Sequence, residues 1–600
     1  MGAGWGGWGA AKALVENGCR VTLLDALPDP TGRTPYLTPS GKPFEAGTRG
    51  FWYDYPNINS LVNKELGLRD DEVFTEFTNS SFYSPEGLEA TAPVFSQGAE
   101  IFGRSIPELP SPIGQVVATF SLFERIPIPD RVTMAGLLLA MIDFTRDEGT
   151  LAAYDRMNAH QLFVRMGISP RLVSDFIRPT LLVGLFKPPE ELSAAVSMEL
   201  LYFYALAHQT SFDVRWIRSR SISELIIAPL ADTLAKYKLD GDQEKKEAVA
   251  TAGMKAAKKA LKKAEKEADA VKGLSPDLQE VAIKAVQEAE EAMFAVAAGK
   301  EVASQALDVR GGSFVKSLDV NEGRVTGLTY TDRSSGETKT LDGLSGCVLA
   351  LGSKGMKAVM NGSPALSRAA PELTAAASMD AIDVIAVRLW LDTTVATRTP
   401  ANVFSRFPQL RGAGGTFFML DQLQNDDPSL LWGDDEVQGS VLACDFYNAG
   451  ALLPLSDEDI TSMLIDELLP SAVPAFGSAK VVDAHVARYP GAVTWFSPGS
   501  YAKRPPLQTS LPNLVCAGDW VRMGDREHGA KGLCQERAYV SGLEAANALA
   551  RNGQLGQNGR QHLVIPIRDD EPQVVAARKL NKLVADAIKP LGLPASPWVR

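Results

Sequence analysis

The sequence predicts a two-lobed α/β protein, and three observations carry that prediction. A glycine-rich turn at the start of the chain runs into a helix and then a strand. Near the other end, an apolar strand finishes in a carboxylate and precedes a second strong helix. Between them lie a helix-rich stretch and a later group of strands. The 600 residues, 45% apolar and 22% charged, have the composition of a globular protein with more than one domain.

The charge and cysteine content exclude several functions. The net charge of -12 from 60 basic and 72 acidic residues argues against a nucleic-acid partner. No apolar run reaches the 18 residues of a bilayer span. The five cysteines are far apart, which predicts neither a disulfide framework nor a metal site and favours a reducing compartment.

The opening turn has the spacing of a dinucleotide-binding fingerprint. Gly2, Gly4 and Gly7 form G-x-G-x-x-G, the next residues are a helix pattern that Gly18 ends, and 19–24 read as a strand. Asp25 follows that strand, where a carboxylate can accept hydrogen bonds from ribose hydroxyls. The helix N-terminus would stabilise phosphates. These features together predict a Rossmann-like unit, although a Gly-rich loop before a structural helix would give part of the same pattern.

A strand normally precedes such a turn, and here the sequence begins at the turn itself. We therefore expect Gly2 to lack the strand that would direct it toward the pyrophosphate, and the cofactor to be held weakly.

The second motif is Leu514–Asp519, an apolar strand that ends in Ala-Gly-Asp. Its small residues allow a cofactor to lie against the backbone, and Asp519 could bind a ribityl or ribose hydroxyl. The helix that opens at Glu536 could stabilise negative charge with its first amides. Alone, this pair also fits a C-terminal helix packed through Ala and Gly. With the N-terminal fingerprint it predicts the second end of one cofactor site.

The domain organisation follows from these motifs and from shifts in composition. We expect a discontinuous nucleotide-binding domain from residues 1–60, 224–355 and 490–550, with strands at 311–318, 324–331 and 346–351. A mixed α+β substrate domain would take residues 61–223 and 356–489, and 551–600 would be a tail with one helix over 571–588. The Ala/Lys/Glu-rich stretch 243–302 reads as an inserted, solvated helical hairpin.

These motifs resemble the flavin amine oxidase superfamily. Within it the chain is most similar to the phytoene and ζ-carotene desaturase branch. The likeness to that branch rests on Asp175–Ser193, Phe212–Trp216, Pro498-Gly499-Ser500 and Arg504-Pro505.

The resemblance implies an FAD-binding flavoprotein and a set of cofactor residues. The ADP half would lie on Gly2, Gly4, Gly7 and Asp25, and Val315 would bind the adenine through its backbone. Gly32 and Arg33 would lie beside the pyrophosphate or flavin, although the usual second glycine of that segment is Thr31 here. Gly518 and Asp519 would hold the ribityl or pyrophosphate part, and Arg537 and Ala538 at the helix start would face the flavin.

The function that the resemblance implies is dehydrogenation of an apolar isoprenoid, with a hydride passing to flavin N5 and electrons then to a quinone or oxygen. The alternatives are a carotenoid isomerase that uses reduced FAD, an amine oxidase, and a non-catalytic homologue that has lost FAD. The apolar helical middle is the candidate substrate tunnel. The family resemblance also implies a plastid (chloroplast) location, although no transit segment precedes the fingerprint; the cytoplasm is the alternative.

Two further residue sets are left with competing interpretations. His528 lies between the Ala-Gly-Asp strand and the flavin-facing helix; it could touch substrate or flavin, but a loop histidine with its tip in solvent is the simpler expectation.

Leu181–Phe186, followed by Lys187, could insert into a bilayer from which the substrate is drawn, or could be a core helix. We expect His208 to have a structural role and Arg215 to form an internal ion pair.

Overall fold

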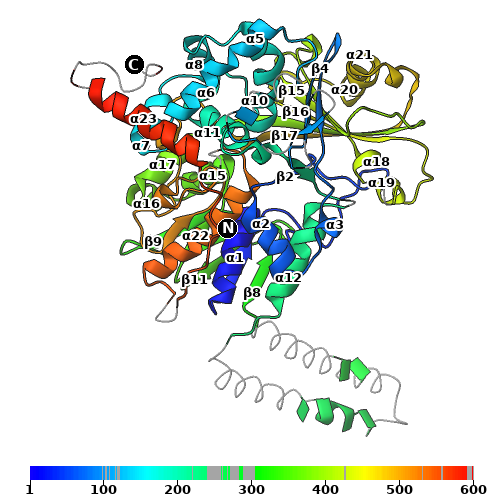
Figure 1. Cartoon of the computed structure of the whole chain (residues 1–600). Coiled ribbons are helices and arrows are strands. Elements are labelled where there is room, and N and C mark those ends of the chain that lie inside the picture. Colours follow the sequence, from blue (N-terminus) through cyan, green and yellow to red (C-terminus); the bar gives the residue numbers. More distant parts are fainter. Residues whose placement is uncertain are drawn as a thin grey trace.

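The fold is that of a computed structural model, and it comprises two lobes with a long C-terminal helix beside them (Figure 1). The structure describes residues 1–600 except 97–98, 102–103, 107–108, 112, 115–116, 118–121, 219, most of 240–304, 425–426, 530–531, 556–558, 589, 591–597 and 599–600. Within 240–304 it describes 258–259, 261–266, 268–269, 283–284 and 286–287, all helical. The rest of the predicted hairpin at 243–302 lies outside the described residues.

The lower lobe in Figure 1 contains the predicted nucleotide-binding elements. Its parallel strands form two pairs, β1 (Val21–Leu24) with β8 (Leu307–Arg310) and β12 (Cys347–Leu349) with β18 (Leu514–Cys516). An antiparallel sheet is made of β9 (Ser313–Asn321), β10 (Arg324–Asp332) and β11 (Thr338–Asp342). The predicted strands are confirmed to within a few residues, whereas β8 and β11 were not predicted.

Met1 and Gly2 lie between the two parallel pairs. The Gly2 amide donates to the Leu24 carbonyl (2.8 Å), and the Ala350 amide donates to the Met1 carbonyl (2.9 Å). The Met1 amino group donates to the Val348 carbonyl (2.9 Å), and burial lowers its pKa. The first two residues therefore connect β1 with β12 at the carboxyl ends of both strands.

The helices of this lobe pack closely through glycines. Gly6 of α1 (Trp5–Glu16) faces α22 (Gln535–Arg551), and a Cβ on Gly542 of α22 would lie 2.1 Å from the Gly6 carbonyl oxygen. Close helix contact therefore requires glycine here. Further helices of the lobe include α2 (Pro56–Ser60), α12 (Ala228–Ala235), α15 (Ser353–Gly362), α16 (Pro364–Ala369) and α17 (Pro371–Ala377).

The upper lobe is built on a seven-stranded sheet in the order β17-β13-β16-β15-β14-β3-β4. The bounds are β3 (Ser80–Ser84), β4 (Gly87–Ala92), β13 (Ala381–Leu391), β14 (Ala401–Phe404), β15 (Gly414–Met419), β16 (Val441–Tyr447) and β17 (Val481–Thr494). The helices above it are α5 (Ile128–Val132), α6 (Met134–Asp143), α7 (Glu148–Tyr154), α8 (Ala159–Arg165), α10 (Arg178–Leu185) and α11 (Ala194–Ala205). On the far side lie α20 (Asp457–Ser462) and α21 (Leu469–Ala472).

The helix-rich stretch expected between the two motifs also contains strands, among them β3 and β4 of the large sheet. A short ribbon of β2 (Gly50–Trp52) and β7 (Val214–Trp216) lies between the lobes. A second, β5 (Ala99–Ile101) with β6 (Arg104–Ile106), is separate from both large sheets. Such two-stranded ribbons of three residues lack the length from which sequence alternation could identify them.

The chain returns across both lobes after α22. We call residues 559–570 the C-terminal strap. The Arg560 amide donates to Asn17 after α1, the Ile565 amide donates to Asn57 of α2 (2.8 Å), and Arg568 forms an ion pair with Asp54 (2.7 Å). The helix α23 (Pro572–Ile588) follows and packs on α6, close to the range predicted for it. Within the described part of the chain, no helix combines the length and apolar character needed to cross a bilayer.

Candidate cofactor site and substrate cavity

The N-terminal fingerprint adopts the geometry that its glycines require. Gly2 has a φ of +88°, and a Cβ there would lie 2.1 Å from the Ala350 carbonyl oxygen. A Cβ on Gly7 would lie 1.8 Å from the Gly2 carbonyl oxygen, so the turn can pack on its helix only without that atom. Gly4 differs, because no more distant part of the described chain comes within 4 Å of its Cβ position. The N-cap of α1 is therefore open on the side that a phosphate would approach.

Asp25 lies beside this turn, as the fingerprint predicts. Its Oδ2 accepts a hydrogen bond from the Ala3 amide (2.6 Å), and its Oδ1 accepts one from the Leu27 amide (2.7 Å). The Asp25 carbonyl also accepts from the Ser313 amide (2.6 Å), which brings β9 and its residue Val315 to the same end of the sheet. A carboxylate has further acceptor capacity for ribose hydroxyls.

Gly32 and Arg33 contact α12 and the segment that leads into it. Gly32 has a φ of +73°, and a Cβ there would lie 2.2 Å from the Ser223 Cβ. The Arg33 guanidinium forms an ion pair with Asp232 of α12, and its side chain is half exposed. The Arg33 side chain thus pairs with α12, and its place beside the pyrophosphate or flavin stays a prediction.

The Ala-Gly-Asp strand meets the fingerprint directly. The Cβ position of Gly6 lies 3.0 Å from the Gly518 amide nitrogen and 3.3 Å from the Ala538 carbonyl oxygen, so residues more than 500 positions apart form one surface. Burial raises the pKa of Asp519 to about 6, while the Arg504 and Arg537 guanidiniums act in the opposite direction. The two predicted ends of the cofactor site therefore coincide in space.

The side chain of Arg537 binds within the protein, and the prediction that the start of α22 faces the flavin stays a prediction. That side chain is fully buried, pairs with Glu527, and donates through Nε to the Asp519 carbonyl (2.7 Å). It thereby holds the 519–528 loop against α22 instead of pointing its guanidinium into the cofactor site.

Arg504 contributes to the family resemblance in the sequence, but the sequence did not place it in the cofactor site. Its Nε and Nη2 donate to the backbone carbonyls of Trp520 (2.6 Å) and Asp519 (3.1 Å), whereas its buried Nη1 has no partner among the described residues. Burial lowers its pKa to about 10. An unsatisfied buried donor beside Asp519 fits a bound group that carries acceptor oxygens.

His528 is buried, which corrects the expectation of a tip in solvent. Its Nε2 lies 3.1 Å from Glu536 Oε1 and 3.4 Å from Asn57 Nδ2, and the same Glu536 oxygen accepts from the Asn57 amide (2.8 Å). The strap covers this network, because the Ile565 amide donates to Asn57.

His208 and Arg215 match their predicted roles. His208 Nε2 lies 2.8 Å from the Asp569 carbonyl oxygen, and Arg215 pairs with Asp70 (2.8 Å).

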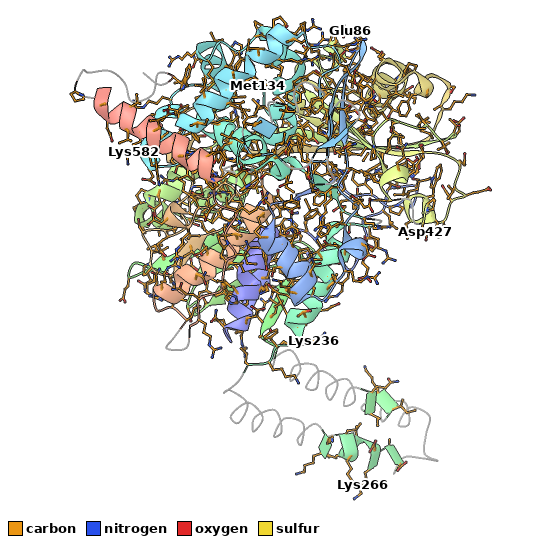
Figure 2. All side chains as sticks on the ribbon, in the orientation of Figure 1. Glu86, Met134, Lys236, Lys266, Asp427 and Lys582 are labelled. Atoms are coloured by element: carbon orange, nitrogen blue, oxygen red, sulfur yellow. The ribbon has the colours of Figure 1, made fainter. Side chains whose placement is uncertain are left out.

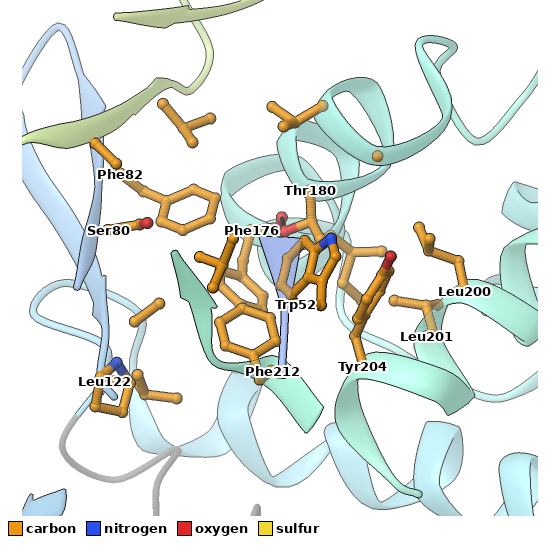
Figure 3. Close-up of a pocket in the computed structure, with 18 of the residues that line it drawn as sticks. Trp52, Ser80, Phe82, Leu122, Phe176, Thr180, Leu200, Leu201, Tyr204 and Phe212 are labelled. Atoms are coloured by element: carbon orange, nitrogen blue, oxygen red, sulfur yellow. Dashed lines mark hydrogen bonds between the residues drawn. The ribbon is translucent and has the colours of Figure 1, made fainter. Parts of the chain in front are cut away.

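An apolar cavity of about 230 Å³ lies between the helices and the sheet of the upper lobe (Figure 3). Predicted tunnel segments contribute Leu137, Leu138 and Met141 of α6 and Leu200, Leu201 and Tyr204 of α11. Figure 3 shows the Trp52, Phe212 and Tyr204 rings close together near the middle of the cavity lining, with the Trp52 and Tyr204 rings 4.1 Å apart. Among the described residues that line the cavity, none carries a charge.

The cavity wall is tied to the start of α22. Trp52 lines the cavity from β2, and the carbonyl of Gly50 on the same strand accepts from Gln535 Nε2 (2.8 Å). Tyr55, just beyond, approaches Cys534 Sγ at the N-cap of α22 with its hydroxyl (3.5 Å). The aromatic end of the cavity therefore lies against the helix start that the sequence predicts to face a cofactor.

The segment Leu181–Phe186 is interior, which corrects the membrane interpretation of it. Leu181, Leu182 and Leu185 are buried, and the Phe186 ring packs 4.3 Å from Tyr447. Lys187 pairs with Glu191 and lies over the Trp495 ring. The leucines fill the core between α10 and β15, where no lipid could reach them.

Comparisons with known proteins agree with this geometry. The family model described as flavin containing amine oxidoreductase matches residues 7–550. The 15-cis-phytoene desaturase of Solanum lycopersicum is 27% identical over 192 residues, which are 32% of this chain and 30% of that protein's length.

Solved structures with a similar fold cover nearly all of the chain. The cyclohexylamine oxidase of Brevibacterium oxydans is 12% identical with a TM-score of 0.52, over 92% of this chain and 98% of that one. A redesigned putrescine oxidase is 14% identical with a TM-score of 0.55, over the same shares. At these identities the likeness establishes the fold.

Proposed function

Because the chain belongs to the flavin-containing amine oxidoreductase family, and is thus an FAD-dependent oxidoreductase, we propose that it dehydrogenates an apolar isoprenoid of the carotenoid kind. The observation that carries the proposal is the uncharged, aromatic-rich cavity whose wall reaches the start of α22. FAD supplies the hydride acceptor when bound, and the electrons leave to a quinone or oxygen.

The residues present fit that cofactor. The open N-cap at Gly4 suits a pyrophosphate, and Asp25 has acceptor capacity for a ribose. The unpartnered Arg504 Nη1 and the Asp519 carboxyl suit a polar group beyond it. Cavity side chains such as Trp52, Leu138 and Leu201 would exclude water and orient an apolar chain toward this site.

A charged amine is a poorer fit, because an ammonium in the cavity would have no counter-ion among the described lining residues. The curated relative is named as a desaturase of chloroplasts and chromoplasts. That name supports the carotenoid proposal and the proposal of a plastid location for this chain.

We also propose contact with a membrane surface, from which a substrate of this kind would be drawn. Exposed apolar side chains gather on helices next to the cavity wall: Ile128 and Val132 of α5, Leu139 of α6, Val164 of α8, and Leu580, Leu583 and Val584 of α23. Figure 1 places α5, α6, α8 and α23 on one side of the molecule, and Figure 2 labels Met134 and Lys582 there. Lys579 and Lys582 would reach the headgroups while the leucines insert.

The experiment uses the purified protein loaded with FAD. Under anaerobic conditions phytoene or ζ-carotene should bleach the visible flavin absorbance and yield a product with one more double bond. Leu138→Phe, which narrows the cavity, should slow this reduction. Leu139→Phe on the same helix should not, because Leu139 is 59% exposed and points away from the cavity.

Other results would decide between the alternatives. With the flavin reduced beforehand, a product of unchanged mass would indicate an isomerase. Bleaching of the oxidised flavin by uncharged amines alone would indicate an amine oxidase. Protein that takes up no FAD would be a non-catalytic homologue.

A further inference from the structure

A groove of about 960 Å³ lies between α22, the loop before it, the strap and α23. We call it the strap groove. Its volume is within the range of about 300 to 1,000 Å³ that is typical of small-ligand sites. Among the described residues, it shares no lining residue with the apolar cavity of the upper lobe. The two hollows are therefore separate, and each has room for a ligand of its own.

The strap groove combines apolar walls with charges of both signs. Six of its described lining residues are apolar, among them Ile567 of the strap and Val575 and Ala576 of α23. Four others are basic and four are acidic. A ligand with a net charge of either sign would meet side chains of the same sign. A neutral ligand with an apolar body therefore fits this groove best.

The groove also offers hydrogen-bond donors that the protein does not use. Arg568 pairs with Asp54 (2.7 Å). Arg526 and Lys579, in contrast, are exposed and form no ion pair with any described residue. Their N–H groups can donate to oxygen atoms of a ligand. The neutral ligand should therefore carry acceptor oxygens.

His528 connects the strap groove with the start of α22. It lines the groove, although only 4% of the residue is exposed. Its Nε2 donates to Glu536 Oε1 (3.1 Å) in the first turn of α22, because an ionised carboxylate only accepts. No described residue forms a hydrogen bond with Nδ1. That nitrogen is thus left to exchange a proton with a ligand in the groove.

The wall of the strap groove continues into the proposed membrane face. Ala576 and Lys579 lie on α23, which also carries the exposed Leu580 and Leu583. Figure 1 shows α23 as a long helix beside both lobes. A ligand dissolved in a membrane would therefore reach the groove along α23, without passing through the apolar cavity.

We infer that the strap groove binds the electron acceptor and that this acceptor is a quinone. A quinone has no net charge, and its two carbonyl oxygens can accept from Arg526 and Lys579. Its ring and apolar tail suit the wall at Ile567 and Val575. The inference rests on the proposed function in one respect, that the electrons leave to a quinone and not to oxygen.

Reduction of a quinone to a hydroquinone takes up two electrons and two protons. Reduced flavin, when bound, supplies both electrons and one of the protons. His528 would donate the second proton from Nδ1 to a quinone oxygen, and it would regain a proton from water in the groove. This uptake balances the proton that the substrate releases when it loses a hydride.

The test follows reoxidation of the flavin by itself. FAD-loaded protein is reduced photochemically without oxygen and mixed with decylplastoquinone, and the recovery of visible absorbance gives the rate. The rate should saturate with the quinone concentration. Equilibrium dialysis of the oxidised protein should detect bound decylplastoquinone that saturating phytoene does not displace, because the two hollows are separate.

Variants assign this binding to the strap groove. Ala576→Trp fills the groove and should raise the half-saturating quinone concentration by about tenfold or more. Ala587→Trp is the matched control and should have no effect, since Ala587 is exposed on the same helix and does not line the groove. Arg526→Gln combined with Lys579→Gln should also weaken quinone binding, which keeps the test valid if the tryptophan lowers the melting temperature.

His528→Gln tests the proton donor. Glutamine can still donate to Glu536, but it cannot carry a second proton. The maximal rate of reoxidation should therefore fall by about tenfold or more, while the half-saturating quinone concentration stays unchanged. A change in bound flavin or melting temperature without a lower rate would show that His528 is only structural.

Displacement of the quinone by phytoene, or a rate that does not saturate, would overturn the inference and leave the proposed dehydrogenation standing. An unchanged half-saturating concentration in both groove variants would also overturn it. If phytoene and ζ-carotene do not reduce the flavin, but quinone binding still depends on the groove, the proposed substrate is wrong and the acceptor site stands.

Discussion

Gly2 and Gly7 are in contact with neighbouring backbone, whereas Gly4 between them faces open space. The three glycines of one motif therefore have two different reasons to lack a side chain. For Gly2 and Gly7 the reason is the fold, and for Gly4 the reason is what binds there.

Gly4→Ala should therefore lower FAD affinity by about tenfold or more, roughly 1.4 kcal/mol, because its methyl group occupies the approach to the helix amides. Calorimetric titration of the flavin-free protein would measure it. The melting temperature without FAD should stay close to that of the native protein. Gly352→Ala is the control, because Gly352 is the N-cap of α15 and also has open space at its Cβ position. If both substitutions weaken FAD equally, Gly4 has no special role.

Asp445 gives a pH-dependent prediction at the same scale. Burial raises its pKa from 3.8 to about 6 despite the Arg49 and Arg388 guanidiniums, so the folded state holds a proton that the unfolded state has lost. Its protonation stabilises the fold fully below about pH 3.8, and this contribution is lost as the pH rises through about 6. The melting temperature of Asp445→Asn relative to the native protein should therefore increase across that range. A constant difference would contradict the raised pKa.

At the scale of elements, the first two residues occupy a place between two parallel strand pairs. About five or six apolar β-forming residues added before Met1 would extend this backbone between β1 and β12, which would both gain ladder hydrogen bonds. FAD occupancy, read from the ratio of visible to ultraviolet absorbance, should increase in the extended protein. The same number of Gly/Ser residues serves as the control. Equal occupancy in all three proteins would show that the existing Met1–Gly2 contacts suffice.

The connection at 243–302 gives the second prediction for an element. The two chain ends that flank it are held together, because the Ala306 amide donates to the Tyr237 carbonyl (3.2 Å) and Lys238 pairs with Gln305. Deleting 243–302 and joining Asp242 to Ala303 should leave bound FAD and the melting temperature nearly unchanged, since closure entropy depends weakly on loop length. Loss of flavin in the deletion variant would show that the segment supports the lobe.

The elements that sequence reasoning predicted well are those set by local pattern. The helix α1 follows from the fingerprint and Gly18, and β18 follows from its apolar run before Asp519. Other features depend on partners far along the chain. His528 is buried because Asn57 and the strap lie over it, and nothing in its own loop indicates that. Asp445 and Arg388 each interrupt an apolar strand, which was a usable signal, but their diagonal placement on β16 and β13 depends on strand register.

On the scale of the whole molecule, the exposed apolar side chains proposed to contact a membrane lie on two parts of the chain. Some are on α5, α6 and α8 of the upper lobe, and the others are on α23, which follows the strap. Replacing both Leu580 and Leu583 by Ser should reduce co-sedimentation with anionic liposomes by about tenfold or more. Each leucine is worth about 1.5–3 kcal/mol when fully buried. The melting temperature should not fall, because both side chains are more than half exposed.

Val437→Ser with Val482→Ser is the matched control for this face, since these valines are also exposed but lie elsewhere on the upper lobe. A similar loss of liposome binding in the control would mean that the attraction is not specific to the α23 side.

The backbone bridge between Lys238 and Gln305, on either side of the inserted segment, has a consequence for how this protein can change over evolution. Lys236 lies at the lower edge of the body, away from the cavity (Figure 2). A segment inserted where two backbone strands already meet needs only adjacent termini of its own, and it leaves the hydrogen bonds of its host in place. This position therefore tolerates insertion of a folded domain. Different lineages could carry different inserted domains there, and a fluorescent protein could be inserted, without changes to either lobe.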